Sequence, residues 1–221
     1  VTADAYAKRL SEILGSNKNI YNTGSLSIEN FKKLKLLSLS ELNERWGVDK
    51  DRPFILITLH PETESYENNV RYVSELVKAL KCLDDFSLLI TMPNSDTMGN
   101  FIREKWKIFA NEKENVHLVE NLGTQGYLSA MQHSFCILGN SSSGFIEAAM
   151  FPKWVVNIGR SQAGRILTDN IVQTDFNAEE ILSAIHHIRL AGSPHSVNIY
   201  GDGRASQIMI SAIKDLSSAQ E

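Results

Sequence analysis

Residues Phe54 to Leu59 read FILITL, an apolar run without a charged side chain, and this stretch decides the fold of the chain. Its β-branched and aromatic side chains, flanked by prolines at 53 and 61, are typical of a strand that is buried on both faces. Similar runs follow along the chain: SLLITM at 87–92, VHLV at 116–119, CILG at 136–139, WVVNI at 154–158 and NIVQT at 170–174. The sequence therefore predicts a sheet that begins at Phe54.

Helical patterns separate these apolar runs. We expect helices near residues 67–82, 98–111, 123–133, 143–150 and 178–190. Apolar strands that alternate with amphipathic helices form βαβ units, and helices then cover both faces of the resulting parallel sheet. The predicted fold class is therefore α/β, a Rossmann-like doubly wound parallel sheet, with its ligand in the loops at the carboxyl ends of the strands.

The first 50 residues differ from this pattern. They predict a helix, a short strand IYNTG at 20–24 and a second helical region rich in Leu and Lys, before Gly47 and Asp51 to Pro53 interrupt the chain. We interpret residues 1–50 as a lead-in from a separate amino-terminal domain, and residues 51–221 as the Rossmann-like domain with a final helix that runs to about Leu216. The chain starts with Val rather than Met, and we expect it to be part of a longer protein.

Composition excludes several classes of protein. The chain has 221 residues, a net charge of −4 and 43% hydrophobic residues, which is an ordinary globular profile. No apolar run approaches the roughly 20 residues that cross a bilayer, so we expect a cytoplasmic protein without membrane contact. An acidic chain without a basic stripe argues against nucleic acid as a partner. Cys82 and Cys136 lack the spacing of disulfide or zinc sites, so neither is suggested. We expect no metal and no cofactor.

The stretch ILGNSSSGFIE, at 137–147, joins a predicted strand to a predicted helix. Its small residues leave the first N–H groups of that helix uncovered, and these groups attract anions together with the helix dipole and the serine hydroxyls. The candidate anion-binding residues are Ser141, Ser142, Ser143 and Gly144. Glu147 would repel a phosphate at that point, but its carboxylate suits a pair of sugar hydroxyls. The alternative is a simple helix cap, with Glu147 in a capping box, and the spacing alone leaves both open.

Three further loops follow predicted strands. His60, in TLHPET, is a candidate for contact with a leaving phosphate or for acid and base chemistry, or it merely binds loop backbone. Asn94, in MPNSDTMG, either donates to a ligand or belongs to an ordinary turn. Arg160 and Arg165, in NIGRSQAGR, suit a diphosphate, and the alternative is that they are surface arginines.

The motifs TLHPET, GNSSSGFIEAAMFPKWVVNIGRSQAGR and NIYGDGRAS, in this order, resemble those of the hydrolysing UDP-N-acetylglucosamine 2-epimerases. The resemblance is to the branch that makes N-acetylmannosamine, or a diacetylated relative, for sialic and legionaminic acid synthesis. It implies two Rossmann-like domains in a GT-B arrangement. The chain looks like the carboxyl-terminal domain, which in the family holds the uridine and the diphosphate.

The resemblance also implies roles for single residues. His60 matches a histidine at the edge of the active site, Ser141 and Ser142 match phosphate-binding serines, and Glu147 matches the carboxylate that takes the ribose hydroxyls. Arg165 matches the arginine of a Gln-x-Gly-Arg motif. Further matches are Asn94 and, through its backbone, Leu122 as nucleotide contacts. Arg160 lies one position before an arginine of many members, whose place is taken by Ser161, so its role is open.

The activity implied by the resemblance is elimination of UDP from a UDP-2-acetamido sugar to give a glycal, followed by hydration to the free sugar with inverted C2. The expected ligands are the UDP-sugar and UDP, and a homo-oligomer is expected for the full-length enzyme. We expect the chain alone to be inactive, because the carboxylates at the sugar belong to the other half. Two alternatives stay open: the carboxyl-terminal domain of a GT-B glycosyltransferase, and a non-enzymatic nucleotide-binding module.

Overall fold

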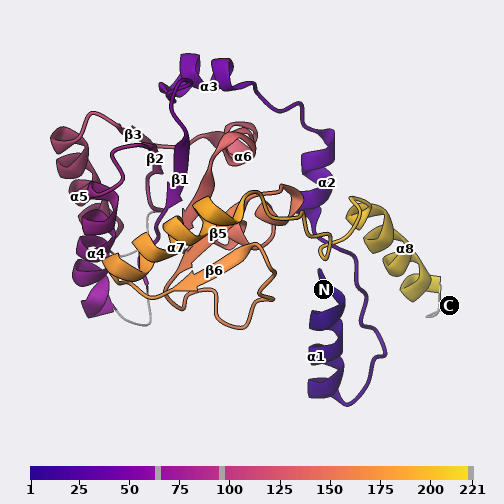
Figure 1. Cartoon of the computed structure of the whole chain (residues 1–221). Helices are drawn as coiled ribbons and strands as arrows, with labels where there is room; N and C mark the ends of the chain where they lie inside the picture. The colour runs from indigo at the N-terminus through magenta and orange to yellow at the C-terminus, as the bar shows by residue number, and fades with distance from the viewer. Residues whose placement is uncertain (63–65, 95–97, 219–221) are drawn as a thin grey trace. The chain divides into compact units, whose positions relative to one another are not determined.

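The computed structural model describes residues 1–62, 66–94 and 98–218 (Figure 1). Thr63 of the TLHPET motif and residues 95–97 of MPNSDTMG lie outside the described residues. The chain forms two compact units, one of residues Val1–Lys35 with Val197–Glu221 and the other of residues Leu36–Ser196. The interpretation of residues 1–50 as a lead-in from another domain stays a prediction.

The larger unit contains a six-stranded parallel sheet with the order β3-β2-β1-β4-β5-β6. The strands are β1 (Phe54–Thr58), β2 (Ser87–Thr91), β3 (Val116–Val119), β4 (Cys136–Gly139), β5 (Trp154–Ile158) and β6 (Ile171–Thr174). All six predicted strands are therefore confirmed to within one residue at each end. This order is that of a Rossmann-like sheet, and it reverses direction between β1 and β4.

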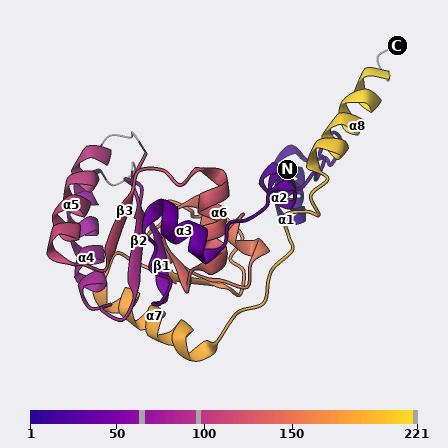
Figure 2. The same ribbon diagram turned by 90° about the horizontal axis from the view of Figure 1, so that it is seen from above.

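Helices cover both faces of the sheet. Ile55, Ile57 and their neighbours on one face pack in a single apolar core with α4 (Asn69–Lys81), α5 (Gly99–Glu112) and α7 (Ala178–Ala191). The other face carries α6 (Gly123–His133), and α3 (Leu39–Trp46) packs on α6. In Figure 2, α6 and α7 lie on opposite sides of the strands. The doubly wound α/β fold is therefore confirmed.

The predicted helix at 143–150 is wrong. Two short 3₁₀ turns take its place, η2 (Ser142–Gly144) and η3 (Ala148–Met150), and a third turn, η1 (Tyr66–Asn68), precedes α4. Serine side chains that bond nearby backbone groups compete with α-helical hydrogen bonding. Gly144 also weakens a helix, and its Cα lies so close to Val155 that an added Cβ would come within 2.9 Å of that side chain. The tight packing against β5 therefore favours short turns.

The predicted strand at 20–24 is wrong as well. These residues belong to the smaller unit, where α1 (Asp4–Leu14), α2 (Leu26–Lys33) and α8 (Ala205–Ser218) are the helices. The Asn22 side chain bonds Asp4 and the N–H of Gly24, at 2.7 and 3.2 Å, and Gly24 has a φ of 72°. A local turn of this kind diverts the backbone from strand pairing.

Glu29 fixes the start of α8 within the smaller unit. Its carboxylate accepts hydrogen bonds from the N–H and the hydroxyl of Ser206, both at 2.7 Å, and pairs with Lys33 at 2.7 Å. The Lys33 and Ser206 hydrogen bonds hold the pKa of Glu29 at about 2. No helix in the described part of the chain combines the length and the apolar character that crossing a membrane requires.

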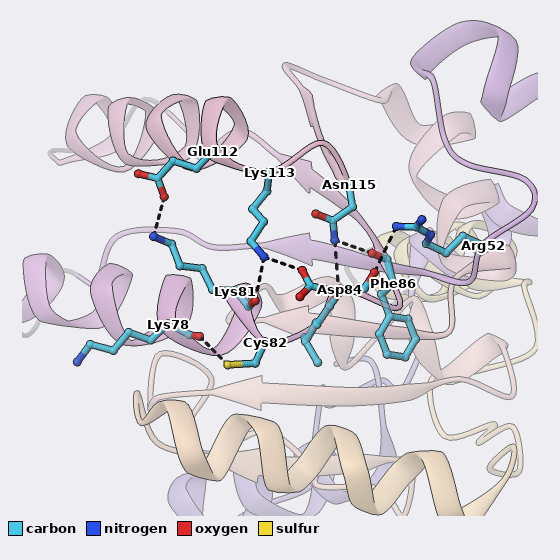
Figure 3. Close-up of polar contacts among 10 residues, drawn as sticks. Arg52, Lys78, Lys81, Cys82, Asp84, Phe86, Glu112, Lys113 and Asn115 are labelled. Carbon is cyan, nitrogen blue, oxygen red and sulfur yellow. Dashed lines mark hydrogen bonds and ion pairs between the residues drawn. The ribbon is translucent and has the colours of Figure 1, made fainter.

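Hydrogen bonds and an ion pair connect the loops at the amino ends of β1, β2 and β3, at the edge of the sheet opposite the carboxyl ends of the strands (Figure 3). The Asn115 amide donates to the carbonyl oxygens of Phe86 at 2.7 Å and Leu83 at 3.4 Å, and Lys113 pairs with Asp84 at 2.6 Å. Arg52 also donates to the Asp84 carbonyl oxygen, at 3.3 Å. The half-buried amide of Asn115 thus connects the turn before β2 to the start of β3.

We expect Asn115→Ala to lower the free energy of unfolding by about 2 kcal/mol, because the Phe86 carbonyl oxygen loses the Asn115 amide and the Leu83 carbonyl oxygen keeps only the Phe86 N–H. Urea denaturation measures this loss. Asn111→Ala, at an exposed position on α5, is the matched control and should stay within about 0.5 kcal/mol of the wild type. Equal stability of the two variants would contradict the role given to Asn115.

Candidate functional site

The loops that follow β1 and β4 meet at the point where the strand order reverses. Asn140 joins them: its buried side chain accepts the His60 N–H at 2.8 Å and donates to the His60 carbonyl oxygen at 2.9 Å. Both backbone groups of His60 are therefore held by one amide. Ligands of doubly wound sheets bind at such a reversal point, so this junction is the candidate site.

The loop after β5 is attached to the same residue. The Asn140 carbonyl oxygen accepts from the Ser161 hydroxyl at 3.2 Å and from the Gln162 amide at 3.0 Å. Gln162 in turn accepts from the Arg165 guanidinium at 2.6 Å. One chain of hydrogen bonds thus crosses the three loops, through His60, Asn140, Gln162 and Arg165. Within its own motif, Arg165 is oriented by the Gln162 side chain.

The serine loop, residues 141–144 after β4, differs from the expected helix start. A three-residue 3₁₀ turn does not carry the dipole of an α-helix, so the dipole part of the predicted anion site is wrong. The Ser141 hydroxyl caps the turn by accepting the Ser143 N–H at 3.4 Å. A capping box requires Glu or Gln three positions after the cap residue, and that position is Gly144. Glu147 therefore does not form the capping box that was the alternative. Within the described residues, no acceptor receives the backbone N–H of Ser141 or Ser142, so these two N–H groups and the Ser142 hydroxyl remain for an anion.

Hydroxyl groups form a second chain beneath the serine loop. Ser141 bonds Ser143 at 2.9 Å, Ser143 bonds Tyr127 at 2.8 Å, and Tyr127 bonds Thr58 at 3.1 Å. Thr58 continues the chain to Thr91 at 2.8 Å. Burial raises the pKa of Tyr127, the Ser143 and Thr58 hydrogen bonds partly offset this, and the negative charge of Glu147 adds to the increase.

Gly139 permits the close approach of β1 and β4 at this junction. Its φ is 141°, and a Cβ at this position would lie 1.9 Å from the Thr58 carbonyl oxygen. Glycine is the residue that adopts this backbone conformation without strain. The small residue before Asn140 is therefore required by the geometry of the junction.

The remaining candidates lie around this junction. Arg160 is exposed, and its N–H donates to the buried Glu62 carboxylate at 3.3 Å. Arg160 and Glu62, together with Arg71, line an open cavity of about 580 Å³ beside the loop after β5. Asn94 is exposed after β2, and Leu122 is buried at the start of α6. Among the described residues, neither makes a hydrogen bond to the three loops.

Asn140 and Tyr127 are not among the site residues predicted from the sequence. Asn140 stands inside the quoted motif, but its pairing with His60 depends on the alignment of β1 with β4, 80 residues apart in sequence. Tyr127 lies on an amphipathic helix, where an aromatic side chain is typical of packing. Tyr127 lies one helical turn after Gly123, the first residue of α6, and this end of the helix adjoins the carboxyl ends of the strands. That position near the start of a helix was the only indication in the sequence of a role at the site. In the described residues, no group of three or more His, Cys, Asp or Glu side chains is placed to hold a metal ion.

The fold defines the chain as a Rossmann-like α/β domain. A family model described as UDP-N-acetylglucosamine 2-epimerase matches residues 1–214. The chain is 34% identical over 178 residues to a GDP/UDP-N,N'-diacetylbacillosamine 2-epimerase (hydrolyzing) of Campylobacter jejuni. This alignment covers 80% of the chain and 46% of that relative. It is 28% identical over 217 residues to a UDP-N,N'-diacetylbacillosamine 2-epimerase (hydrolyzing) of Legionella pneumophila, over 98% of the chain and 57% of the relative. The chain belongs to the UDP-N-acetylglucosamine 2-epimerase family.

Solved structures agree on the fold. A Staphylococcus aureus MnaA structure with UDP aligns with a TM-score of 0.77 at 19% identity, over 99% of the chain and 59% of that protein. The UDP-GlcNAc 2-epimerase of Neisseria meningitidis, bound to UDP-GlcNAc, aligns with a TM-score of 0.77 at 17% identity, over 97% and 60% of the two chains. These matches confirm the predicted fold class, which resembles the carboxyl-terminal half of a GT-B fold. The chain spans about half the length of the curated relatives it matches.

Proposed function

We propose that this chain is the UDP-binding domain of a hydrolysing 2-epimerase that acts on UDP-N-acetylglucosamine or a related UDP-2-acetamido sugar. One observation carries the proposal: Asn140 joins three loops at the reversal point of the sheet, with His60 on one side and the serine loop on the other. This arrangement offers hydroxyls, two N–H groups and an arginine to a diphosphate. Family membership and the UDP named in a solved relative support this choice of ligand.

In the proposed reaction, the C1–O bond to UDP breaks while the C2 proton is removed, which gives a glycal and UDP. Water then adds across the double bond and returns a proton to the opposite face of C2. The contribution of this chain to catalysis is to stabilise the leaving group, UDP, because negative charge grows on the β-phosphate as the bond breaks. The serine loop and Arg165 would neutralise that charge, and His60 would contact the diphosphate or protonate the leaving oxygen.

The proposal assigns distinct parts of the nucleotide to distinct residues. Ser141 to Gly144 bind the diphosphate, and Glu147 accepts hydrogen bonds from the ribose hydroxyls. Arg165 pairs with phosphate oxygens, while Arg160 reaches them only if its exposed side chain turns from the cavity beside Glu62. The remaining contacts proposed for the nucleotide are those of Asn94 and of the Leu122 backbone.

The epimerase proposal extends to the whole protein. We propose that residues 1–50 lead in from an amino-terminal domain that supplies the carboxylates at the sugar, so that this chain alone has no turnover. A polysialic acid biosynthesis protein of Escherichia coli, 29% identical over 188 residues, supports a role in making sialic-acid-type sugars. A cytoplasmic location and a homo-oligomeric enzyme belong to the same proposal.

A GT-B glycosyltransferase is the alternative, and the family assignment favours the epimerase over it. The two activities differ in their products. The epimerase releases free sugar and UDP without an acceptor, whereas a transferase requires an acceptor. Chromatography of the products that the full-length protein forms from UDP-N-acetylglucosamine or its diacetylated relative separates them.

Calorimetric titration with UDP tests the binding proposal directly. We expect the wild-type chain to bind UDP, and we expect Ser142→Ala to bind it about 10-fold more weakly, because one hydrogen bond to a charged oxygen is lost. Ser74→Ala, at an exposed position on α4, removes a serine hydroxyl far from the loops and should leave the affinity unchanged. No heat and no NMR shift at millimolar UDP, from a chain that is folded by circular dichroism, would refute the proposal.

A further inference from the structure

We propose that Tyr127 is a positioning residue for the diphosphate-binding serines, because its phenolic hydroxyl links Ser143 and Ser141 to the strand threonines. This inference deepens the proposed function and rests on it. It concerns a residue on α6, outside the serine loop and outside the motifs that the sequence analysis singled out.

The geometry supports one continuous relay. The Tyr127 hydroxyl lies 2.8 Å from the Ser143 hydroxyl and 3.1 Å from that of Thr58, so it bridges the loop after β4 and the last residue of β1. Ser143 then lies 2.9 Å from the Ser141 hydroxyl. The Tyr127 side chain is half-buried and its hydroxyl is held by two hydrogen bonds, so it limits the movement of both serine oxygens.

Each hydroxyl has a single proton, so the relay can run in one of two directions. In one direction Thr91 donates to the Ile57 carbonyl oxygen, at 3.2 Å, and every other hydroxyl donates one step toward Thr91. In this direction the Ser141 proton is used by Ser143. In the other direction every hydroxyl donates one step toward Ser141, and Ser141 is left to donate to an anion.

A bound phosphate selects the second direction. Ser141 then donates to a phosphate oxygen, while Ser143, Tyr127 and Thr58 each donate to the next hydroxyl. The only bond given up is the 3.2 Å contact from Thr91 to the Ile57 carbonyl oxygen. Hydrogen bonds in such a chain polarise one another, so the phosphate contact gains strength from the hydroxyls behind it. The relay requires the Tyr127 hydroxyl, because this group accepts a hydrogen bond from Thr58 while it donates one to Ser143.

The buried surroundings of Tyr127 preserve this dual role. Its pKa is raised by burial, with a further increase from the negative charge of Glu147, so the phenol keeps its proton at neutral pH. A phenolate would lack the proton that is passed toward Ser143.

Tyr127→Phe tests the inference, because phenylalanine keeps the ring and removes only the hydroxyl. We expect the dissociation constant for UDP to rise about 10-fold, while that for uridine, which has no phosphate, changes less than about 2-fold. Calorimetry or NMR titration of the whole chain measures both. Tyr6→Phe, on α1 of the smaller unit, is the matched control and should change neither value.

A double-mutant cycle with Ser143→Ala gives a second measurement. If the two hydroxyls act in one relay, Tyr127→Phe adds little to the loss already caused by Ser143→Ala. Wild-type affinity of Tyr127→Phe for UDP, equal losses for UDP and uridine, or additive losses in the cycle would each overturn this inference alone. Failure of the wild-type chain to bind UDP would overturn the proposed function, and this inference with it.

Discussion

Replacing Glu147 with alanine is expected to weaken UDP binding about 100-fold. The proposed carboxylate accepts hydrogen bonds from two ribose hydroxyls, and each charge-assisted bond contributes about 1.5 kcal/mol, or about 3 kcal/mol together. Glu147 is partly exposed between the turns η2 and η3, so a nucleotide can reach it. Calorimetric titration of wild type and variant with UDP measures the change.

The ligand can be changed instead of the protein to isolate the ribose contact. We expect the wild-type chain to prefer UDP over 2′,3′-dideoxyuridine diphosphate by about the same factor, and the Glu147→Ala variant to bind the two ligands equally. Glu104→Ala, which removes an exposed carboxylate on α5, is the matched control for the change in net charge. A Glu147→Ala variant that still prefers UDP would show that another group contacts the ribose.

Glu147 stays a candidate ligand residue, and the local structure predicted for it is wrong. The sequence predicts this carboxylate one turn into an α-helix, but the segment forms two 3₁₀ turns. The choice between helical forms depends on competition between serine side chains and backbone groups, and on the contact between Gly144 and Val155. The first effect is local hydrogen bonding and the second is packing between residues distant in sequence. The pattern of apolar residues predicts neither.

The strands were predictable for the opposite reason. Ile55 and Ile57 in β1 are fully buried, as are their neighbours in β2 and β4, so almost every position in these strands has to be apolar. Burial on both faces leaves a continuous signal in the sequence. The strand predicted at 20–24, IYNTG, contains only two large apolar side chains, and its asparagine and glycine favour a turn.

The candidate site was predictable in its residue types and not in its connections. Ser141 and His60 attracted attention because serines and a histidine after buried strands suggest ligand contacts. Asn140 did not, because its role exists only when β1 and β4 lie side by side in their observed register. A hydrogen bond between residues 80 positions apart leaves no periodicity for a single sequence to reveal.

Asn140→Ala is expected to produce the largest combined loss of stability and binding. Asn140 is 2% exposed, and its truncation removes the two hydrogen bonds that its amide makes with the N–H and the carbonyl oxygen of His60. Losing these two hydrogen bonds at a half-buried junction costs about 3 kcal/mol, so we expect a melting temperature lower by about 6–12 °C. We also expect UDP affinity to fall at least about 30-fold at a temperature where the variant is folded, because the loops after β1 and β4 lose their common support.

Asn170→Ala separates the two effects. Asn170 is also almost fully buried, at 1% exposure, and its side chain donates to the Lys153 carbonyl oxygen at 3.0 Å and accepts from Thr168 at 2.6 Å. It lies at the amino ends of β5 and β6, away from the carboxyl-end loops. We therefore expect a comparable loss of stability with UDP affinity within about 2-fold of the wild type. If Asn140→Ala also kept its UDP affinity, the junction would serve stability alone, and the three loops would hold the nucleotide without it.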